Sequence, residues 1–340
     1  MELNNRLHKI YLWILYLAII VGVVLALFQF FFDKFVWLDE AMLSLNIRDR
    51  NFTELLQPLD YVQVAPIGFL YIQKLLTTIF GFNEFVLRVT PLLSWFVSLY
   101  FMYKLTFTLF KDKTLALLAT AIFSTTLILI IYSNEIKQYS SDVMFAIVIF
   151  YLTVALDFKK TKSILQFAIA GAIIIWFSNV SVIMLTTAGL YLLVKEFFIQ
   201  KNYRVIAIFT LWAISLAVYY TLFIYHHPSA EIMKHHWASS FLPLNRLWGR
   251  FIYYSLRNIY MDVFSFDKFW YIPAFLSIVG LVILIVSRQF TLLFFVLFPI
   301  ALHFALSSQG MYPFSGRFIL YMLPALVILF AYSVTKLFKA

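Results

Sequence analysis

The sequence predicts an all-α fold, a polytopic bundle of about ten transmembrane helices that forms one domain over residues 1–340. Two observations lead to this prediction. Hydrophobic residues make up 63% of the chain and charged residues only 12%, which is too little polar surface to cover a soluble globule. The apolar residues also form continuous runs, rather than the roughly ten-residue alternating segments of an outer-membrane barrel. Helices satisfy their own backbone groups, so such a bundle is stable in lipid.

The first apolar run, 10–32, is long and aromatic and lacks a small-residue cleavage site. We expect it to stay in the protein as a signal anchor. Around Ser178 and Asn179 the pattern leaves two interpretations open, a tight hairpin or two broken helices. The remaining predicted spans are 85–110, 114–132, 143–156, 164–177, 180–198, 205–225, 269–286, 290–306 and 318–338.

The distribution of charge predicts which side each loop faces. If the N-terminus is cytoplasmic, most lysines and arginines of the short loops fall inside, with Lys137 as the main exception. Most of the sixteen acidic residues then lie outside. We therefore expect an integral protein of the plasma (inner) membrane with both termini in the cytoplasm. The net charge of +10 reflects this topology, and no nucleic-acid partner is predicted.

Two outer segments, 33–84 and 226–268, are long enough to carry structure of their own. Within the first, residues 66–80 are apolar at helical spacing, with Gln73 and Lys74 on one side, which predicts a helix lying in the membrane interface. The chain ends shortly after the last predicted span, so no soluble C-terminal domain is expected.

An adjacent pair of carboxylates, Asp39 and Glu40, follows the first span in the motif Trp37-Leu38-Asp39-Glu40. A partly desolvated carboxylate at this position can have its basicity raised toward that of a general base. The alternative is a solvated loop acid that marks where the helix leaves the membrane. The motif alone leaves both interpretations open.

A second polar cluster lies between two apolar runs at 132–139. Glu135, Lys137 and Tyr139 alternate along it, so that all three side chains could face one cavity. The alternative is a short turn held by a Glu–Lys pair, which contributes little by itself.

Three arginines lie near the outer ends of spans: Arg88, Arg257 and Arg317. A guanidinium at this depth commonly extends toward the headgroups without further function. It is also well suited to hold a phosphate through two parallel hydrogen bonds. Pro313 and Gly316 precede Arg317 and permit an unusual backbone path, which favours a functional role for that arginine.

Two histidine pairs in the second outer segment, His226-His227 and His235-His236, could ligate zinc or another divalent ion. Their spacing matches no strong metal motif, and Glu231 is the only acid close to them. We therefore assign no metal, and expect these histidines to face a substrate or the aromatic belt. Because the chain has no cysteine, thiolate metal sites and thiol catalysis are excluded.

Taken in order, these motifs resemble those of GT-C membrane glycosyltransferases. The similar branch is the one that contains protein O-mannosyltransferases and lipid A aminoarabinose transferases, glycosyltransferase family 39. Lys137 departs from the pattern, since relatives often have arginine there. The matching elements are Asp39-Glu40 after the first span, Pro66-Ile67-Gly68-Phe69-Leu70, the run from Gly81 to Pro91 with Glu84 and Arg88, the run from Ser133 to Tyr139, and Gly316-Arg317 followed by Leu320 and Pro324.

The resemblance implies transfer of a sugar from a polyprenyl-phosphate donor to a hydroxyl of a lipid, glycan or protein, with inversion, on the non-cytoplasmic face. By the same resemblance, Asp39 takes the proton of the acceptor hydroxyl, and Glu40 or Glu135 orients the acceptor or the base. The residues implied to hold the donor phosphate are Arg88, Lys137, Tyr139, Arg257 and Arg317.

The resemblance requires no cofactor, and it leaves a divalent metal unassigned. A competing class of function is a glycolipid transporter or flippase, which would predict internal repeats and helices broken at the membrane midplane. Neither feature is clear in the sequence. A non-catalytic binding protein with the same fold is the third alternative, because fold does not imply function.

Overall fold

The computed structural model describes residues 2–32, 35–225, 227–264 and 268–339, and within these ranges the protein is helical without any strand. Short 3₁₀ turns lie at Glu54–Leu56, Asp60–Val62, Tyr203–Val205, Ala238–Ser240 and Gly316–Met322, and π-helical turns at Leu193–Ile199 and Tyr220–Ile224. The α-helices are α1 Glu2–Phe32, α2 Leu38–Asp49, α3 Ile67–Phe80, α4 Glu84–Phe110, α5 Lys113–Thr125, α6 Leu127–Tyr132, α7 Tyr139–Ala155, α8 Thr161–Ile174, α9 Ser181–Leu192, α10 Ile206–Tyr219, α11 Ala230–His236, α12 Trp248–Phe264, α13 Tyr271–Val286, α14 Phe290–Ser308 and α15 Leu323–Lys339.

The predicted helical membrane bundle is confirmed. Each predicted span coincides with a helix or with two consecutive helices. The spans that coincide with shorter apolar helices are those at α5, α7, α8 and α13. Among the described residues, 6 helices are long and apolar enough to cross a membrane: Arg6–Phe32, Glu84–Phe110, Ser181–Ile199, Tyr203–Ile224, Phe290–Ser308 and Gly316–Phe338.

One predicted span is interrupted, and packing decides between the two interpretations of the stretch around Ser178. The span over 114–132 breaks between α5 and α6, where the Thr126 hydroxyl donates back to the Ile122 carbonyl and competes with helical hydrogen bonding. The stretch around Ser178 forms two separate helices, since α8 packs against α10 whereas α9 packs against α7 and α14. The two-helix interpretation of this region is therefore the correct one.

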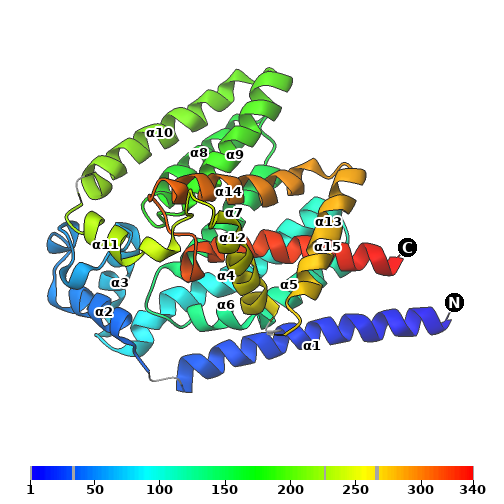
Figure 1. Ribbon diagram of the computed structural model, residues 1–340, viewed down its shortest axis with the longest axis horizontal. Helices are drawn as coiled ribbons and strands as arrows, with labels where there is room; N and C mark the ends of the chain where they lie inside the picture. The colour runs from blue at the N-terminus through cyan, green and yellow to red at the C-terminus, as the bar shows by residue number, and fades with distance from the viewer. Residues whose placement is uncertain (1, 33–34, 226, 265–267, 340) are drawn as a thin grey trace.

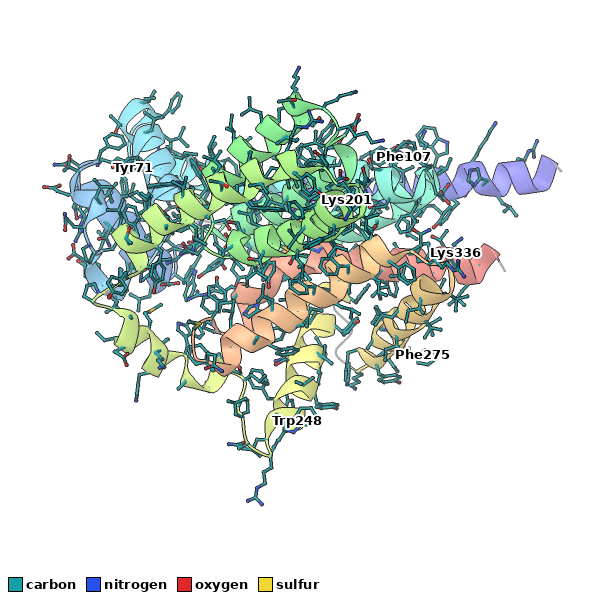
Figure 2. All side chains as sticks on the ribbon, turned by 90° about the horizontal axis from the view of Figure 1, so that it is seen from above. Tyr71, Phe107, Lys201, Trp248, Phe275 and Lys336 are labelled. Atoms are coloured by element: carbon teal, nitrogen blue, oxygen red, sulfur yellow. The ribbon has the colours of Figure 1, made fainter. Side chains whose placement is uncertain are left out.

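The long helices run along the longest axis of the molecule, and both termini lie at the same end of it (Figure 1). Helices α2, α3 and α11 gather at the opposite end (Figure 1). Apolar side chains such as Phe275 on α13 and Trp248 on α12 point away from the bundle (Figure 2). This exposed apolar surface is that of a protein solvated by lipid.

A proline inside α4 explains how α3 docks onto the bundle. Pro91 has no N–H, so the Leu87 carbonyl lacks its usual partner within the helix. Gln73 of α3 is fully buried and donates its Nε2 to that carbonyl at 2.8 Å. Ser140 of α7 donates its hydroxyl to the Pro91 carbonyl, also at 2.8 Å. Neighbouring helices thus supply donors to the Leu87 and Pro91 carbonyls of α4.

Helix α3 also fixes the end of α2. The Lys74 ammonium donates to the carbonyls of Ile47 and Arg48 at 2.9 and 3.2 Å, at the C-terminal end of α2, where a cation is favourable. Because α2 begins with Asp39 and Glu40, this contact holds in place the helix that carries the predicted carboxylates.

Candidate active site

Asp39 lies between two cations that come from distant parts of the chain. Its Oδ1 is 3.1 Å from the Nζ of Lys137, in the connection between α6 and α7. Its Oδ2 is 2.8 Å from a terminal nitrogen of Arg317, in the 3₁₀ turn Gly316–Met322 that directly precedes α15. The Asp39 side chain keeps 21% of its surface exposed, so an incoming molecule has access to it. The structure therefore brings together Asp39, Lys137 and Arg317, which the sequence placed in three separate motifs. These three residues are called the Asp39 group below.

Gln63 connects the first two members of this group. Its Nε2 donates to Asp39 Oδ1 at 3.0 Å, and its Oε1 accepts from Lys137 Nζ at 2.6 Å. The preceding residues Tyr61 and Val62 have φ angles of 60° and 56°, which is strained backbone, above all for the β-branched valine. No sequence motif identified Gln63, because a lone glutamine in a loop carries no spacing signal.

The Arg317 guanidinium lies among aromatic rings. Its Cζ is 5.2 Å from the ring centre of Tyr139, 5.3 Å from Trp237, 5.5 Å from Trp37 and 5.7 Å from Phe318. Cation–π contacts of this kind stabilise a guanidinium and restrict its direction. Tyr139 therefore contributes its ring to the arrangement. Trp237, a residue of the second outer segment that no sequence motif identified, contributes another ring.

The backbone before Arg317 has the unusual path that the sequence predicted. Gly316 has a φ of 48°, in the left-handed region that favours glycine. The buried His303 of α14 holds the flanking segment, because its Nε2 is 2.9 Å from the Pro313 carbonyl and its Nδ1 is 3.0 Å from the Tyr321 hydroxyl. Because the Pro313 carbonyl can only accept, Nε2 carries a hydrogen and donates to it. His303 is a positioning residue that sequence reasoning missed.

Replacing His303 with leucine should lower the melting temperature of the purified protein. The change leaves the Pro313 carbonyl and the Tyr321 hydroxyl buried without their partner, at about 1–3 kcal/mol for each unsatisfied group. Thermal unfolding followed by intrinsic fluorescence measures the effect. His235→Leu, on the exposed helix α11, is the matched control and should melt like the wild type. Equal melting of both variants would show that the His303 contacts do not hold the segment.

Glu40 is buried and forms no ion pair with another described residue. Its Oε1 accepts from the Ile136 N–H at 2.6 Å, and its Oε2 accepts from the Trp37 N–H at 3.3 Å. Burial raises the pKa of Glu40, although both N–H donors and the charge of Arg88 act against that rise. Arg88 itself is buried and donates to the Phe35 carbonyl at 2.8 Å. Together they join the start of α2 to α4 and to the connection that carries Lys137.

The expected rise in the basicity of Asp39 is not what the structure shows. Burial acts to raise the pKa of Asp39, but Lys137, Gln63 and Arg317 together hold it below its usual value. Burial also lowers the pKa of Lys137, against the pull of Asp39. The carboxyl whose pKa is raised is instead that of Glu135. Burial, with a further contribution from Glu40, brings the pKa of Glu135 to about 7. Oxygen Oε2 of Glu135 has no hydrogen-bond partner among the described residues.

Glu135 should make the stability of the protein depend on pH. Its pKa is about 7 in the folded protein against an ordinary value of 4.5, so the folded state holds the proton more tightly. This contribution to stability is complete below pH 4.5 and is lost as the pH rises through 7. The melting temperature of the wild type should therefore fall relative to that of Glu135→Gln across this window. Glu231→Gln, at an exposed position on α11, should leave the wild-type profile unchanged.

The remaining predicted residues lie outside the Asp39 group. Arg257 is on α12 and forms no ion pair or hydrogen bond with that group within the described ranges. His226 falls outside the described residues. His227 accepts from the Ser229 N–H through Nδ1 at 3.2 Å, whereas His235 and His236 lie on the exposed α11. In the part of the chain that the structure describes, no three acidic or histidine side chains are grouped to hold a metal ion.

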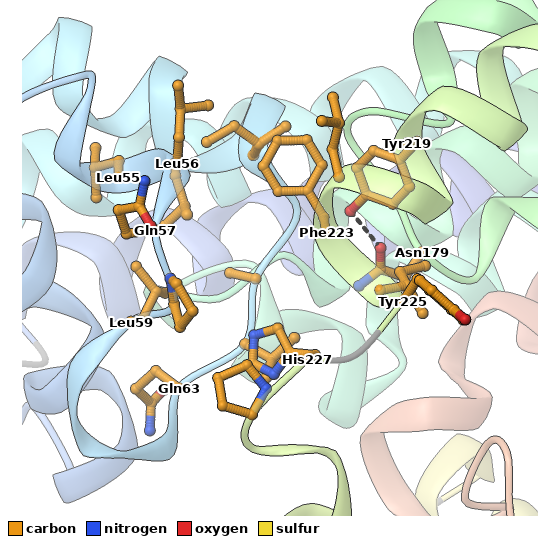
Figure 3. A pocket seen from close by; sticks show the side chains of 18 residues that line it. Leu55, Leu56, Gln57, Leu59, Gln63, Asn179, Tyr219, Phe223, Tyr225 and His227 are labelled. Carbon is orange, nitrogen blue, oxygen red and sulfur yellow. Dashed lines mark hydrogen bonds between the residues drawn. The ribbon is translucent and has the colours of Figure 1, made fainter.

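A cavity of about 160 Å³ adjoins the Asp39 group, and Gln63 is one of its lining residues. Figure 3 shows Gln63, Leu55, Gln57 and Leu59 on one side, facing Tyr219 and Asn179 on the other, with His227 between them. The Tyr219 hydroxyl donates to Asn179 Oδ1 at 2.6 Å, which is the dashed line in Figure 3. The first outer segment and the outer end of α10 thus enclose the space together.

Residues 64–225 match the family model described as dolichyl-phosphate-mannose-protein mannosyltransferase. Over that segment, which is just under half of the chain, the sequence is similar to this family. The match indicates a membrane glycosyltransferase of the GT-C type, as the sequence resemblance implied. The matched segment contains Arg88, Glu135, Lys137 and Tyr139, whereas Asp39 and Arg317 lie outside it and join the site only in space. No curated protein matches the chain.

Proposed function

We propose that this protein, which is similar to the mannosyltransferase family over residues 64–225, transfers a sugar from a polyprenyl-phosphate donor to a hydroxyl acceptor, with inversion at the sugar. The observation that supports the proposal is the position of the Asp39 carboxylate between Lys137 and Arg317. A carboxylate and two cations in a half-buried site are the groups that this reaction needs: a base for the acceptor and positive charge for the leaving phosphate.

The two cations are suited to the donor phosphate. A phosphate with a single net negative charge resembles the carboxylate that Lys137 and Arg317 now contact, and it can take the place of that carboxylate between them. The aromatic rings around Arg317 keep the guanidinium directed toward the site. The apolar outer surface of the bundle offers the polyprenyl chain a lipid-like path to the phosphate.

Displacement by the phosphate would also make Asp39 a better base. Lys137, Gln63 and Arg317 hold the pKa of Asp39 low, so the pKa should rise when a donor phosphate engages the cations instead. The carboxylate would then accept the proton of the acceptor hydroxyl only when a donor is present. Glu40 and Glu135 are proposed to orient the acceptor or the base, and Arg88 to support Glu40.

The proposed step is a single displacement. The acceptor oxygen loses its proton to Asp39 and bonds to the anomeric carbon, while the bond from that carbon to the phosphate oxygen breaks and its electron pair leaves with the polyprenyl phosphate. Attack opposite the leaving group inverts the sugar. A phosphate leaves without protonation, so one base and one cationic clamp are enough, and the proposal requires no cofactor.

The proposal places the reaction on the non-cytoplasmic side of the plasma membrane. The Asp39 group is built from α2, the connection between α6 and α7, and the segment before α15, and α2 lies at the end of the molecule opposite to both termini (Figure 1). With cytoplasmic termini, which the positive charges of the inner loops favour, this end faces outward.

The test is the fate of the donor in liposomes that contain the purified protein. Radiolabelled polyprenyl-phosphate sugars are supplied together with membrane extract as the source of acceptor. A transferase releases free polyprenyl phosphate and moves the label to a second molecule. If the donor crosses between leaflets and stays intact, the protein is a carrier, and the proposal is wrong.

A further inference from the structure

The lining of the cavity beside the Asp39 group indicates which class of acceptor molecule the protein binds. It meets that group at Gln63, which lines the cavity and donates to the Asp39 carboxylate at 3.0 Å. A molecule in the cavity is therefore separated from Asp39 by one side chain. Given the proposed function, the donor phosphate binds where Asp39 now contacts Lys137 and Arg317. The molecule that receives the sugar then binds in the cavity.

Among the residues that the structure describes, no charged side chain lines the cavity. Its polar members are glutamines, Asn179, tyrosines and His227, and no lysine, arginine, aspartate or glutamate contributes. Burial lowers the pKa of His227, so this ring is neutral at physiological pH as well. A neutral lining gives a phosphorylated or otherwise charged group no counter-charge for its loss of water. The occupant should therefore be uncharged.

The polar groups that face the cavity offer both donors and acceptors. Asn179 receives the Tyr219 hydroxyl at its Oδ1, while its Nδ2 donates to no other described residue. His227 accepts from Ser229 at Nδ1, which leaves the ring hydrogen on Nε2. The walls between them combine aliphatic side chains with three aromatic rings, those of Tyr219, Phe223 and Tyr225. Hydroxyl groups match such a lining, because each one can donate and accept.

On both sides of the cavity the backbone adopts uncommon conformations. The outer end of α10 widens into the π-helical turn Tyr220–Ile224, a rare form that is frequent at functional sites. On the facing side, Tyr61 and Val62 adopt positive φ angles immediately before Gln63. The volume of about 160 Å³ lies well below the roughly 300–1,000 Å³ of pockets for drug-sized ligands. It is suited to a single ring rather than to an extended peptide.

We infer that the cavity binds a neutral sugar ring of a glycan acceptor and presents one of its hydroxyls to Asp39. Asn179 and His227 donate to the ring oxygen or hydroxyls, the aromatic walls contact its apolar face, and Gln63 lies between the ring and the base. In the transfer step, the Gln63 side chain moves aside and the presented hydroxyl gives its proton to Asp39. Its oxygen bonds to the anomeric carbon of the donor sugar, while the bond from that carbon to the phosphate oxygen breaks and its electron pair leaves with the polyprenyl phosphate.

The experiment uses the full-length protein in lipid discs, without sugar detergents. The probe is a neutral methyl hexoside that carries a small photoreactive diazirine, and labelled peptides are identified by mass spectrometry. We expect labelling within 55–65 and 219–228. Asn179→Ala and Tyr219→Phe should each reduce it about two- to tenfold, the effect of losing one hydrogen bond. Tyr220→Phe, a neighbouring tyrosine outside the cavity lining, is the control and should label like the wild type.

Several results would overturn the inference. These are labelling only by the 6-phosphate of the same hexoside, labelling only by a serine- and threonine-containing diazirine peptide, absence of labelling in the cavity, or an equal loss in Tyr220→Phe. Binding of polyprenyl phosphate to the same preparation is measured in parallel. If Lys137→Met weakens that binding but the hexoside does not label the cavity, the acceptor assignment fails while the proposed function stands. The opposite pattern, a labelled cavity with no Lys137-dependent binding of polyprenyl phosphate, removes the proposed function.

Discussion

Replacing Asp39 with asparagine should reduce the rate of sugar transfer by about 10²–10⁴-fold, the contribution of a positioned general base. Asparagine has nearly the same shape, and its carbonyl oxygen can still accept from Gln63, but it cannot take a proton. The rate is measured as release of polyprenyl phosphate from a labelled donor in liposomes.

Binding of polyprenyl phosphate should move in the opposite direction in the same variant. The change removes the carboxylate that occupies Lys137 and Arg317, so these cations become available and binding should be as tight as in the wild type or tighter. Asp49→Asn, at an exposed position on the same helix, should change neither quantity. If Glu135→Gln costs more activity than Asp39→Asn, then Glu135 is the base, and the role proposed for Asp39 is wrong.

Replacing Lys137 with methionine should reduce the turnover rate by about 10²–10³-fold. Methionine fills a similar volume but removes the charge that would stabilise the departing phosphate in this buried site. Single-turnover measurements with saturating donor separate this step from binding.

Two further variants test the interpretation of the Lys137 result. Lys137→Arg keeps the charge and should recover part of the rate, since the Gln63 amide and the Asp39 carboxylate can both accept from a guanidinium. Lys162→Met changes an exposed lysine at the start of α8 and should have no effect. An inactive Lys137→Arg variant with intact donor binding would indicate that the amine has a role other than its charge.

The fold could be predicted from the sequence because the membrane requires long apolar runs, and such runs are visible without any tertiary information. The positions of α1, α4 and α14 follow directly from their composition. The interruption at Thr126 was not predicted, since a threonine hydroxyl that bonds back to Ile122 looks the same in sequence as one that does not. The helix expected at 66–80 is confirmed as α3, but its contact with the α2 carbonyls through Lys74 depends on tertiary packing.

The candidate site could be predicted only in part. Asp39, Lys137 and Arg317 each lie in a short polar motif at the outer end of a span, where ionisable residues are uncommon enough to be noticed. Gln63, Trp237 and His303 have no such signal, because their importance comes from what lies beside them after folding. The pKa of Asp39 was predicted in the wrong direction, since the sequence shows that the group is near the membrane but not that two cations flank it.

Asp39 comes early in the chain and Arg317 late, yet they are 2.8 Å apart in the folded protein. Since the N-terminal part of a chain leaves the ribosome first, the carboxylate enters the membrane long before its guanidinium partner is made. An unfinished or prematurely terminated polypeptide thus lacks Arg317, one of the two cations proposed to hold a phosphate. Under the proposed function, such a defective copy could not bind and consume a lipid-linked sugar.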